Sequence, residues 1–289
     1  MAEKGLVSKI RKIEESIRQK QNKPVEARAE PPKEKKPVKA KVSTTGKIIR
    51  LPIWPEEVRG TPNALLRSAL FAAIQGKNRK IYESPTVLAS VGGITIRYLG
   101  IQLDQSDLDV WEQCVHLARE HPLGSECYFS VRSFLKAIKR STGKHDYEWL
   151  KSVFMRLNGG SVEITHNHKA FFGSLVEGGA RDDETGEYII RLDPNLSKFF
   201  EAGWTPINWE QRQQLRRKPL ALWLQGFYAS HDKPYPMKPE TLRELSGSEN
   251  KDIKRFRQHL KNALNDLKIV GSIEDFEFND GLIHIYKGK

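Results

Sequence analysis

A stretch near the carboxyl end combines apolar residues at helical spacing with side chains that can hydrogen-bond to DNA bases. A helix from about residue 250 to residue 267 is predicted by apolar residues that recur every three or four positions: Ile253, Phe256, Leu260, Leu264 and Leu267. The opposite face carries basic and amide side chains: Lys251, Lys254, Arg255, Gln258, Lys261, Asn262 and Asn265. Arg and Lys suit the guanine edge in the major groove, and Gln and Asn suit the adenine edge. This face therefore has the chemistry of a recognition helix.

The same face could instead be an ordinary solvated helix surface. Such surfaces usually mix Glu with Lys, because opposite charges one turn apart stabilise a helix. Here Asp252 and Asp266 lie at the edges of the face, and the central outward positions carry no acidic residue. The pattern favours DNA recognition over a solvated surface.

A second, weaker candidate helix lies between residues 146 and 157. Its outward side offers Tyr147 and Lys151 for contact with DNA, but Glu148 and Met155 share that side. Contacts to DNA phosphates are predicted for three basic residues on and just before this helix: Lys144, Lys151 and Arg156. A protein interface explains the mixture of side chains equally well, so both interpretations stay open at this helix.

Residues that could support catalysis are better explained by local structure. His166-Asn167-His168 has the spacing of metal-dependent nicking nucleases, but it lies between two strand-like runs, where Asn favours a turn. Ser141-Thr142-Gly143-Lys144 lacks the first Gly of a phosphate loop, and residues 182–186 are typical of a polar turn. We therefore predict no enzyme activity, no cofactor and no metal, and a nicking initiator is the least favoured alternative.

Two copies of one order of elements surround the candidate helices. The first copy is predicted as an extended piece, two helices and three strand-like runs: 127–129, 134–138, 146–157, 162–165, 170–176 and 188–192. The second is predicted as a leading helix, an extended piece, two helices and a hairpin: 220–230, 235–237, 239–245, 250–267, 272–278 and 282–286. An offset of 107 residues aligns Leu135 with Leu242 and Trp149 with Phe256. Helix, turn, helix and hairpin in this order predict an α+β fold of tandem winged helix-turn-helix domains.

The charge of the chain is concentrated at its amino end. The 289 residues carry a formal charge of +12, and residues 1–47 hold 14 Lys or Arg against 6 acidic residues, a net charge of +8. Residues 21–47 are rich in Pro and Lys, which predicts a disordered basic tail. Inside the tail, a short amphipathic helix, either marginal or partner-docking, is predicted by four apolar residues: Leu6, Ile10, Ile13 and Ile17. The two folded domains are then predicted at 48–205 and 206–289.

Two further helices are predicted from the residues at their starts. Thr61-Pro62 has the chemistry of an N-cap and first turn, and an apolar face follows it as far as Ile74. Ser106 and Asp109 have the spacing of a capping box at the start of another helix. The carboxylates of Asp107 and Asp109 are then explained by the positive end of that helix rather than by catalysis.

The cysteine residues and the hydropathy of the chain indicate the cellular compartment in which the protein is found. Cys114 and Cys127 have neither the spacing nor the histidine neighbours of a metal site or a disulfide framework. No apolar run approaches the ~18 residues of a membrane span, and the amino end lacks a signal-peptide core. These features predict a soluble cytoplasmic protein that makes no membrane contact.

Over residues 51 to about 249 the chain resembles the TrfA family of plasmid replication initiators. The resemblance is carried by long, specific stretches, among them LPIWPEEVRGTPNALLRSALFAAI, IRYLGIQLDQSDLDVWE, RDDETGEY and KPLALWLQGFYASHDKPYPMK. It weakens once the predicted recognition helix begins, and it is absent from residues 1–47. The resemblance implies tandem winged-helix domains that bind double-stranded DNA.

The same resemblance implies a role beyond binding. Members of this family bind repeated sites (iterons) in a plasmid origin, help to open the adjacent AT-rich duplex and bring in the host replication initiator and the replicative helicase. They also switch between monomer and dimer. The chain contains no Gln-Leu-x-Leu-Phe peptide, so a polymerase-clamp contact is not carried over. A transcriptional repressor with the same DNA-reading parts is the main alternative.

Overall fold

Apolar side chains gather in two cores that follow one another along the chain. The computed structural model describes residues 48–288 except 77, 167 and 168, and these residues belong to one compact unit. The first core draws on residues 51–209 and the second on residues 215–285. No helix within these described ranges is both long and apolar enough to cross a membrane. The predicted basic tail and its short amphipathic helix lie outside the described residues.

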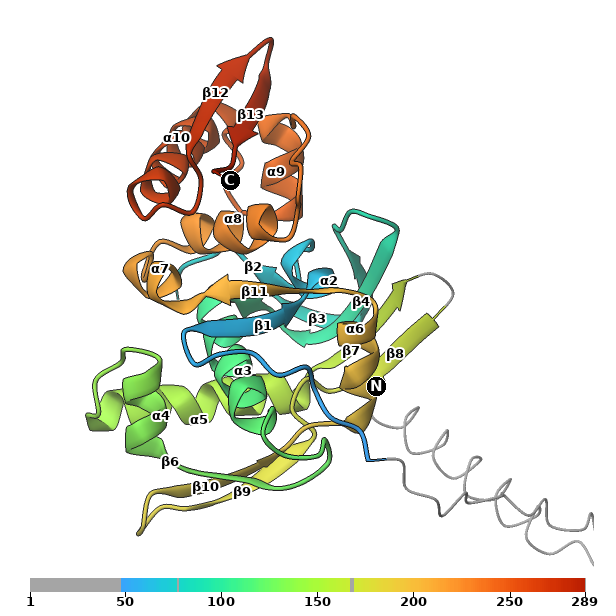
Figure 1. Cartoon of the computed structure of the whole chain (residues 1–289), viewed down its shortest axis with the longest axis vertical. Helices are drawn as coiled ribbons and strands as arrows, with labels where there is room; N and C mark the ends of the chain where they lie inside the picture. Colours follow the sequence, from blue (N-terminus) through green and yellow to red (C-terminus); the bar gives the residue numbers. More distant parts are fainter. Residues whose placement is uncertain (1–47, 77, 167–168, 289) are drawn as a thin grey trace, which may run out of the picture. The chain divides into compact units, whose positions relative to one another are not determined.

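The first core supports a pair of helices with a three-stranded sheet (Figure 1). Its elements in chain order are α3 (Gln105–Ala118), β6 (Cys127–Ser130), α4 (Val131–Ala137), α5 (Lys144–Gly159), β9 (Gly178–Asp182) and β10 (Glu187–Arg191). β10 lies between β6 and β9 and pairs antiparallel with both. The hairpin that follows the helix pair therefore closes on the strand that precedes it.

The second core repeats this arrangement in shorter form. Its elements are α8 (Pro219–Ala229), α9 (Pro239–Leu245), α10 (Ile253–Ile269), β12 (Asp275–Asn279) and β13 (Leu282–Tyr286). Just before α9, Met237 forms an antiparallel bridge with Ile283 of β13, and β12 is the hairpin partner of β13. Met237 thus takes the place of β6, and β13 the place of β10. Residues 246 and 247 form the turn between α9 and α10: Gly247 has φ +61°, and a Cβ there would lie 2.9 Å from that of Ala72.

The strands directly after α5 belong to a different sheet from the one predicted. This sheet has four antiparallel strands in the order β3 (Ile81–Leu88), β4 (Ile94–Ile101), β7 (Ser161–His166) and β8 (Lys169–Gly173). Its inner face puts Ile96 opposite Ile164 and Ile164 opposite Phe171, all three buried in the first core. Alternation along a strand predicts which face is buried, but it does not identify the neighbouring strand.

Segments far apart in the chain meet at β1 (Val58–Pro62) and β11 (Trp204–Asn208), which pair antiparallel with Thr61 opposite Thr205. The predicted domain boundary between residues 205 and 206 falls inside β11. Apolar contacts change from the first core to the second between Trp209 and Leu215. The remaining short elements are α2 (Asn63–Leu66), β2 (Phe71–Ala72), β5 (Leu103–Asp104), the 3₁₀ helix η1 (Pro194–Leu196), α6 (Ser197–Glu201) and α7 (Trp209–Gln214).

The long helix predicted to start at Thr61-Pro62 is wrong. Both residues belong to β1, and the helix that follows, α2, has only four residues. Residues 69–74 form bends and the short strand β2 instead. Leu70 and Phe71 are nevertheless buried in the first core. A run of closely spaced apolar residues therefore led to the wrong prediction of a long helix, although these residues are buried without forming one.

The capping box of α3 lies two residues earlier than predicted. The N-cap is Asp104, whose Oδ1 accepts hydrogen bonds from the backbone N–H groups of Ser106 (2.9 Å) and Asp107 (3.0 Å). In return, Asp107 Oδ2 accepts the backbone N–H of Asp104 at 3.1 Å. Asp107 is therefore a capping residue, while Asp109 points to a different partner, Arg212.

Candidate nucleic-acid interface

Helix α10 buries its predicted apolar stripe and begins at a well-formed cap. Ile253 is half-buried, and the other members of the stripe are buried: Phe256, Leu260, Leu264 and Leu267. Asp252 is the N-cap, and its Oδ1 accepts the backbone N–H groups of Lys254 (2.8 Å) and Arg255 (3.4 Å). The cap fixes the first turn, which carries two of the predicted DNA-contacting residues.

The polar side of α10 faces solvent. All six residues predicted to contact DNA from this helix and its start are exposed: Lys251, Lys254, Arg255, Gln258, Lys261 and Asn262. Gln258 Nε2 donates a hydrogen bond to Asn262 Oδ1 one turn further on, at 3.1 Å. Among the described residues, Lys254, Arg255 and Lys261 have no carboxylate within ion-pair distance, whereas Arg257 and Lys268 each have one. The basic groups in the middle of this face are thus uncommitted.

A cavity of about 810 Å³, here called the α10 groove, runs beside this face. One wall comes from α10 and includes Arg255, His259 and Asn262. The opposite wall includes Gln75 and the segment 217–221, which leads into α8. The groove therefore brings the candidate recognition helix opposite a basic segment at the start of the second core.

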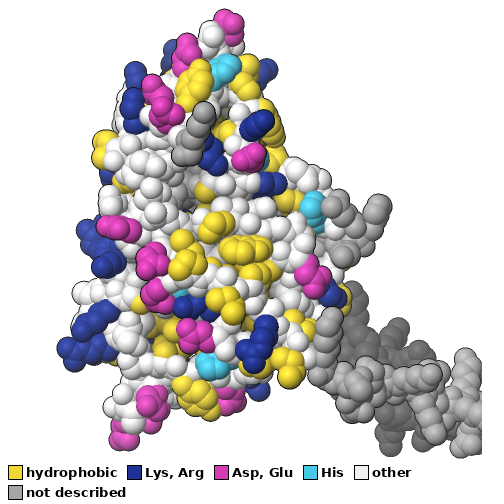
Figure 2. Space-filling view, in the orientation of Figure 1, with side chains coloured by type: hydrophobic (Ala, Val, Ile, Leu, Met, Phe, Trp, Pro, Cys, Tyr) yellow, Lys and Arg dark blue, Asp and Glu magenta, His cyan; other side chains and the backbone are white. Residues whose placement is uncertain are grey.

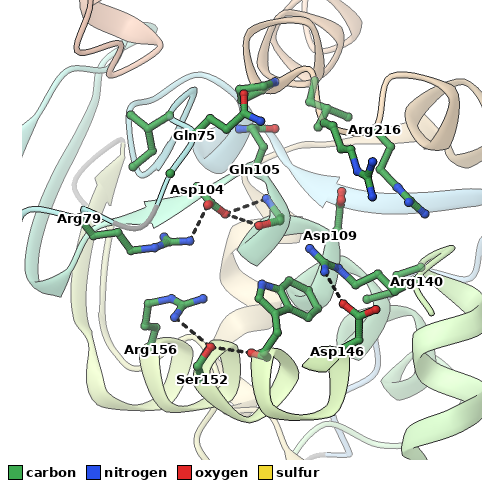
Figure 3. A pocket seen from close by; sticks show the side chains of 18 of the residues that line it. Gln75, Arg79, Asp104, Gln105, Asp109, Arg140, Asp146, Ser152, Arg156 and Arg216 are labelled. Carbon is green, nitrogen blue, oxygen red and sulfur yellow. Dashed lines mark hydrogen bonds and ion pairs between the residues drawn. The ribbon is translucent and has the colours of Figure 1, made fainter. Parts of the chain in front are cut away.

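A second cavity of about 740 Å³, the α5 groove, lies between α5 and the start of α3. Figure 3 shows guanidinium groups entering it from several elements. The arginines that line it are Arg79, Arg140, Arg156, Arg216 and Arg217, and the carboxylates are Asp104, Asp109 and Asp146. The two grooves adjoin, because they share four lining residues: Ile74, Gln75, Arg217 and Pro219.

Arg156, a predicted phosphate contact, already has partners within the protein. Its Nη2 lies 2.7 Å from Asp107 Oδ1, and its Nη1 donates to Ser152 Oγ at 3.3 Å. Asp107 also pairs with Arg79 at 2.8 Å, and burial raises the pKa of this carboxyl group although both guanidinium groups oppose the rise. Arg156 therefore ties α5 to the first turn of α3, because an isolated buried carboxylate would be costly.

The other residues of α5 that were predicted to contact DNA differ in their exposure and in the partners they already have. Lys144 is exposed at the first residue of the helix. Tyr147 is half-buried and packs against the first core. The Lys151 ammonium lies 3.2 Å from both Glu148 Oε1 and Asp183 Oδ1, and hydrogen bonds to these carboxylates raise its pKa. α5 therefore offers fewer uncommitted polar groups than α10.

Arginines that the sequence did not single out occupy the α5 groove. Arg140 lies over the Trp149 ring, 3.3 Å from its centroid, and pairs with Asp146 Oδ1 at 2.8 Å. Arg216 and Arg217 follow α7 and belong to the basic run 216–218. That run was visible in the sequence, but its place between two grooves was not. For Arg140, only the fold brings its guanidinium over Trp149.

Charge on the surface follows this arrangement. Figure 2 shows Lys and Arg side chains along the left edge of the view, with Asp and Glu between them. In Figure 1 the same edge carries α10, α7 and α4 from top to bottom. Lys and Arg side chains also appear elsewhere in this view, so the left edge is one of several places where basic groups reach the surface.

The His-x-His motif and the polar segment 182–186 have structural explanations among the described residues. His166 pairs with Lys169 across the β7–β8 hairpin, and Asn167 and His168 lie outside the described residues. The polar turn is confirmed, because Asp182 Oδ1 accepts the backbone N–H of Glu184 (2.8 Å). Within the described residues, no cluster of three or more His, Cys, Asp or Glu side chains could hold a metal ion.

In this α+β fold the α10 groove, beside the basic face of α10, adjoins the arginine-lined α5 groove. These features are typical of the class of nucleic-acid-binding proteins. Residues 35–287 match the family described as TrfA protein, and the chain belongs to this family. The match extends further toward both ends than the resemblance seen in the sequence. It also reaches through α10 and the final hairpin.

One relative is the plasmid replication initiator protein TrfA of Escherichia coli. It is 26% identical to this chain over 239 residues, which are 80% of the chain and 62% of the relative. The chain therefore spans less than two thirds of that relative's length.

Two crystal structures of domains 2 and 3 of RctB are distantly similar. One has a TM-score of 0.49 and 15% identity, and it covers 75% of this chain and 88% of the other. The second has a TM-score of 0.43 and 14% identity, with coverage of 68% and 81%.

Proposed function

We propose that the protein is a plasmid replication initiator that binds double-stranded DNA at repeated sites in its origin and acts by binding, without catalysis. The single observation that carries this proposal is the solvent-exposed face of α10. Arg255, Gln258 and Asn262 lie there beside lysines that have no carboxylate partner among the described residues. Arg with Gln or Asn on one helix face suits both guanine and adenine edges of the major groove.

The shared order of elements supports tandem winged helix-turn-helix domains. In each copy a leading helix, α3 or α8, precedes a helix pair and an antiparallel hairpin. In each copy the last strand of the hairpin also pairs with the segment ahead of the helix pair. In such domains the second helix of the pair enters the major groove. α10 is then the main sequence reader, and α5 makes the weaker contact.

Family membership supports the later steps of the proposed function. These are opening of the AT-rich duplex next to the repeats, recruitment of the host replication initiator and replicative helicase, and a change between monomer and dimer that limits plasmid copy number. All of them would take place in the cytoplasm, where plasmid DNA lies. The family match over residues 35–287 includes both helix pairs, which supports assigning DNA binding to them.

The decisive experiment uses the origin of the parent plasmid. A footprint of the full chain should protect regularly spaced repeats, and a single-strand-specific probe should then detect opening of the neighbouring AT-rich segment. Protection without opening, in a protein that does not support replication, would favour the repressor alternative. Metal-dependent cleavage of single-stranded origin DNA would favour the nicking alternative.

A further inference from the structure

The segment 216–218 lies at the junction of the two grooves and is held at both of its ends. Leu215 is fully buried in the second core, and the backbone N–H of Lys218 donates to the Leu215 carbonyl at 3.0 Å. Pro219 then begins α8. The turn is therefore fixed at both ends, and its side chains are presented from a defined position.

The same segment is tied to α10. Lys218 Nζ lies 2.7 Å from Asp266 Oδ1, near the carboxyl end of α10. Arg217 lines both grooves, and Arg216 lines the α5 groove. The Lys218 ion pair therefore joins the segment that carries the two arginines to α10.

Nothing in the described part of the chain neutralises Arg216 or Arg217. Neither guanidinium has a carboxylate within ion-pair distance among these residues, whereas Arg140 and Arg156 each have one and Arg79 has two. Arg216 is also close enough to Arg140 for its positive charge to contribute to the lowered pKa of that guanidinium, whose main cause is burial. Like charges gathered in a groove attract an anion.

Backbone strain marks the same position. Arg217 has φ +67°, in the left-handed region that residues other than glycine seldom adopt. Such strain persists only where the surrounding structure enforces it, and it is concentrated at ligand-binding positions. The chain therefore keeps an arginine side chain at a position where glycine would be less strained.

We propose that Arg216 and Arg217 bind the phosphate backbone of the duplex whose bases α10 reads, and so guide that backbone from the α10 groove into the α5 groove. The inference rests on the proposed DNA-binding function and adds to it a contact outside both helix pairs. Phosphate contacts position a protein on DNA without reading its sequence. The pair would therefore add affinity for any duplex and leave the preference among sequences to α10.

The test measures affinity of the full chain against salt concentration, on an origin duplex and on a random duplex of equal length. The double variant Arg216→Gln with Arg217→Gly removes both charges, and the glycine relieves the left-handed backbone, so its melting temperature should not fall. Each lost phosphate contact should make the slope of log K against log salt shallower by about 0.9. Between 50 and 200 mM salt, the affinity of the wild type should then fall about tenfold more than that of the double variant.

Two further variants separate this inference from the proposed function. Lys198→Gln removes an exposed charge on α6, a residue that lines neither groove, and should leave the slope unchanged. Arg255→Ala should reduce the preference for the origin duplex. If the double variant keeps the wild-type slope while Arg255→Ala loses preference, the inference is wrong and the proposed function stands. If the double variant flattens the slope but the wild type binds both duplexes equally, the inference stands and origin recognition fails. A wild type that binds neither duplex overturns both.

Discussion

Arg212 Nε lies 2.6 Å from Asp109 Oδ1, although 103 residues separate the two in sequence. The same Nε lies 3.1 Å from Glu112 Oε2, and all three side chains are buried. Burial raises the pKa values of both carboxyl groups, and the Arg212 charge opposes the rise. Because Arg212 lies on α7, just before the basic turn at 216–218, this cluster anchors the segment that leads from the first core to the second.

Arg212→Leu should destabilise the protein strongly. It leaves two buried carboxylates without their cation, and loss of one partner from a buried ion pair typically costs about 3–5 kcal/mol. Denaturant unfolding measures the change. The control is Arg257→Leu, which breaks the exposed Arg257–Glu240 pair on the surface and should change stability by less than about 1 kcal/mol. Equal effects of the two variants would contradict the assigned role of Arg212.

His116 should make the folded protein sensitive to acid. Its Nδ1 accepts a hydrogen bond from Trp54 Nε1 at 3.1 Å, and its Nε2 lies 2.9 Å from Glu56 Oε2. Burial, and then the charge of Arg59, lower the pKa of His116 to about 4. The unfolded chain takes up this proton near pH 6.5. The free energy of unfolding should therefore fall as pH drops from about 6.5 to about 4, because only the unfolded state gains the proton.

His116→Gln tests this pH dependence, since glutamine keeps an amide oxygen that can accept from Trp54. Unfolding by denaturant at pH 7, 6 and 5 gives the free energy for each protein. The wild type should lose more stability than the variant over this range, even if the variant is less stable at pH 7. Parallel pH profiles for the two proteins would show that His116 is not the group that titrates.

Base reading is expected to depend on Arg255 and Gln258. Arg255→Ala or Gln258→Ala should each lose about 1–3 kcal/mol of discrimination between the origin repeat and random duplex. Competition binding at one fixed salt concentration measures this difference. Lys151→Ala is the matched control on α5: any loss of binding should affect both duplexes alike and leave their discrimination unchanged, because a phosphate contact reads no sequence. Full preference in both α10 variants would remove α10 from the role of sequence reader.

The sequence predicted α10 well because one face of the helix packs on the second core and the other face is exposed to solvent. Each apolar residue of the stripe enters that core, and each polar residue between them meets solvent. Local periodicity therefore contained nearly all the information. The hairpin β7–β8 was misplaced for the opposite reason. The burial of Ile164 depends on Ile96 in a strand more than 60 residues earlier, and no local pattern records that pairing.

The sequence identified an available candidate for DNA contact only where a side chain of suitable type is also exposed in the fold. Arg255 is basic by type and exposed in the fold, whereas Arg156 is basic by type but bound to a buried carboxylate. The sequence explained Asp107 and Asp109 by the helix end, and this holds for Asp107 alone. Asp109 forms an ion pair with Arg212, a residue that only the tertiary structure brings near it.

The His-x-His motif should be dispensable. His166 lies at the end of β7, opposite Lys169 of the same hairpin. Replacing His166 and His168 together by Gln should leave origin binding and plasmid replication largely intact, because the proposed function acts by binding and uses neither imidazole. Replication of an origin plasmid in cells and a binding assay in vitro measure the two functions. Lost replication in a variant that folds and binds DNA normally would revive the nicking alternative.

The basic amino-terminal segment should act on DNA through charge alone. Residues 1–47 carry a net +8 of the formal +12, and a basic arm contributes mainly by releasing counterions from phosphate. Deleting these residues should make the slope of log K against log salt shallower by a few units, at about 0.9 for each lost contact. Association should also become slower, since long-range steering depends on charge. Preference for the origin repeat should survive, because the folded helices read the bases.

A shorter deletion separates charge from protein docking within this segment. Residues 1–20 hold 6 Lys or Arg against 3 acidic residues, a net +3, and they include the apolar series from Leu6 to Ile17. Removing them should flatten the salt slope less than the full deletion does and leave replication intact. An unchanged slope after the full deletion would show that the segment does not lie on DNA. If the shorter deletion abolishes replication while DNA binding stays normal, the apolar series docks a protein, and a pull-down with a peptide of residues 1–20 should capture it.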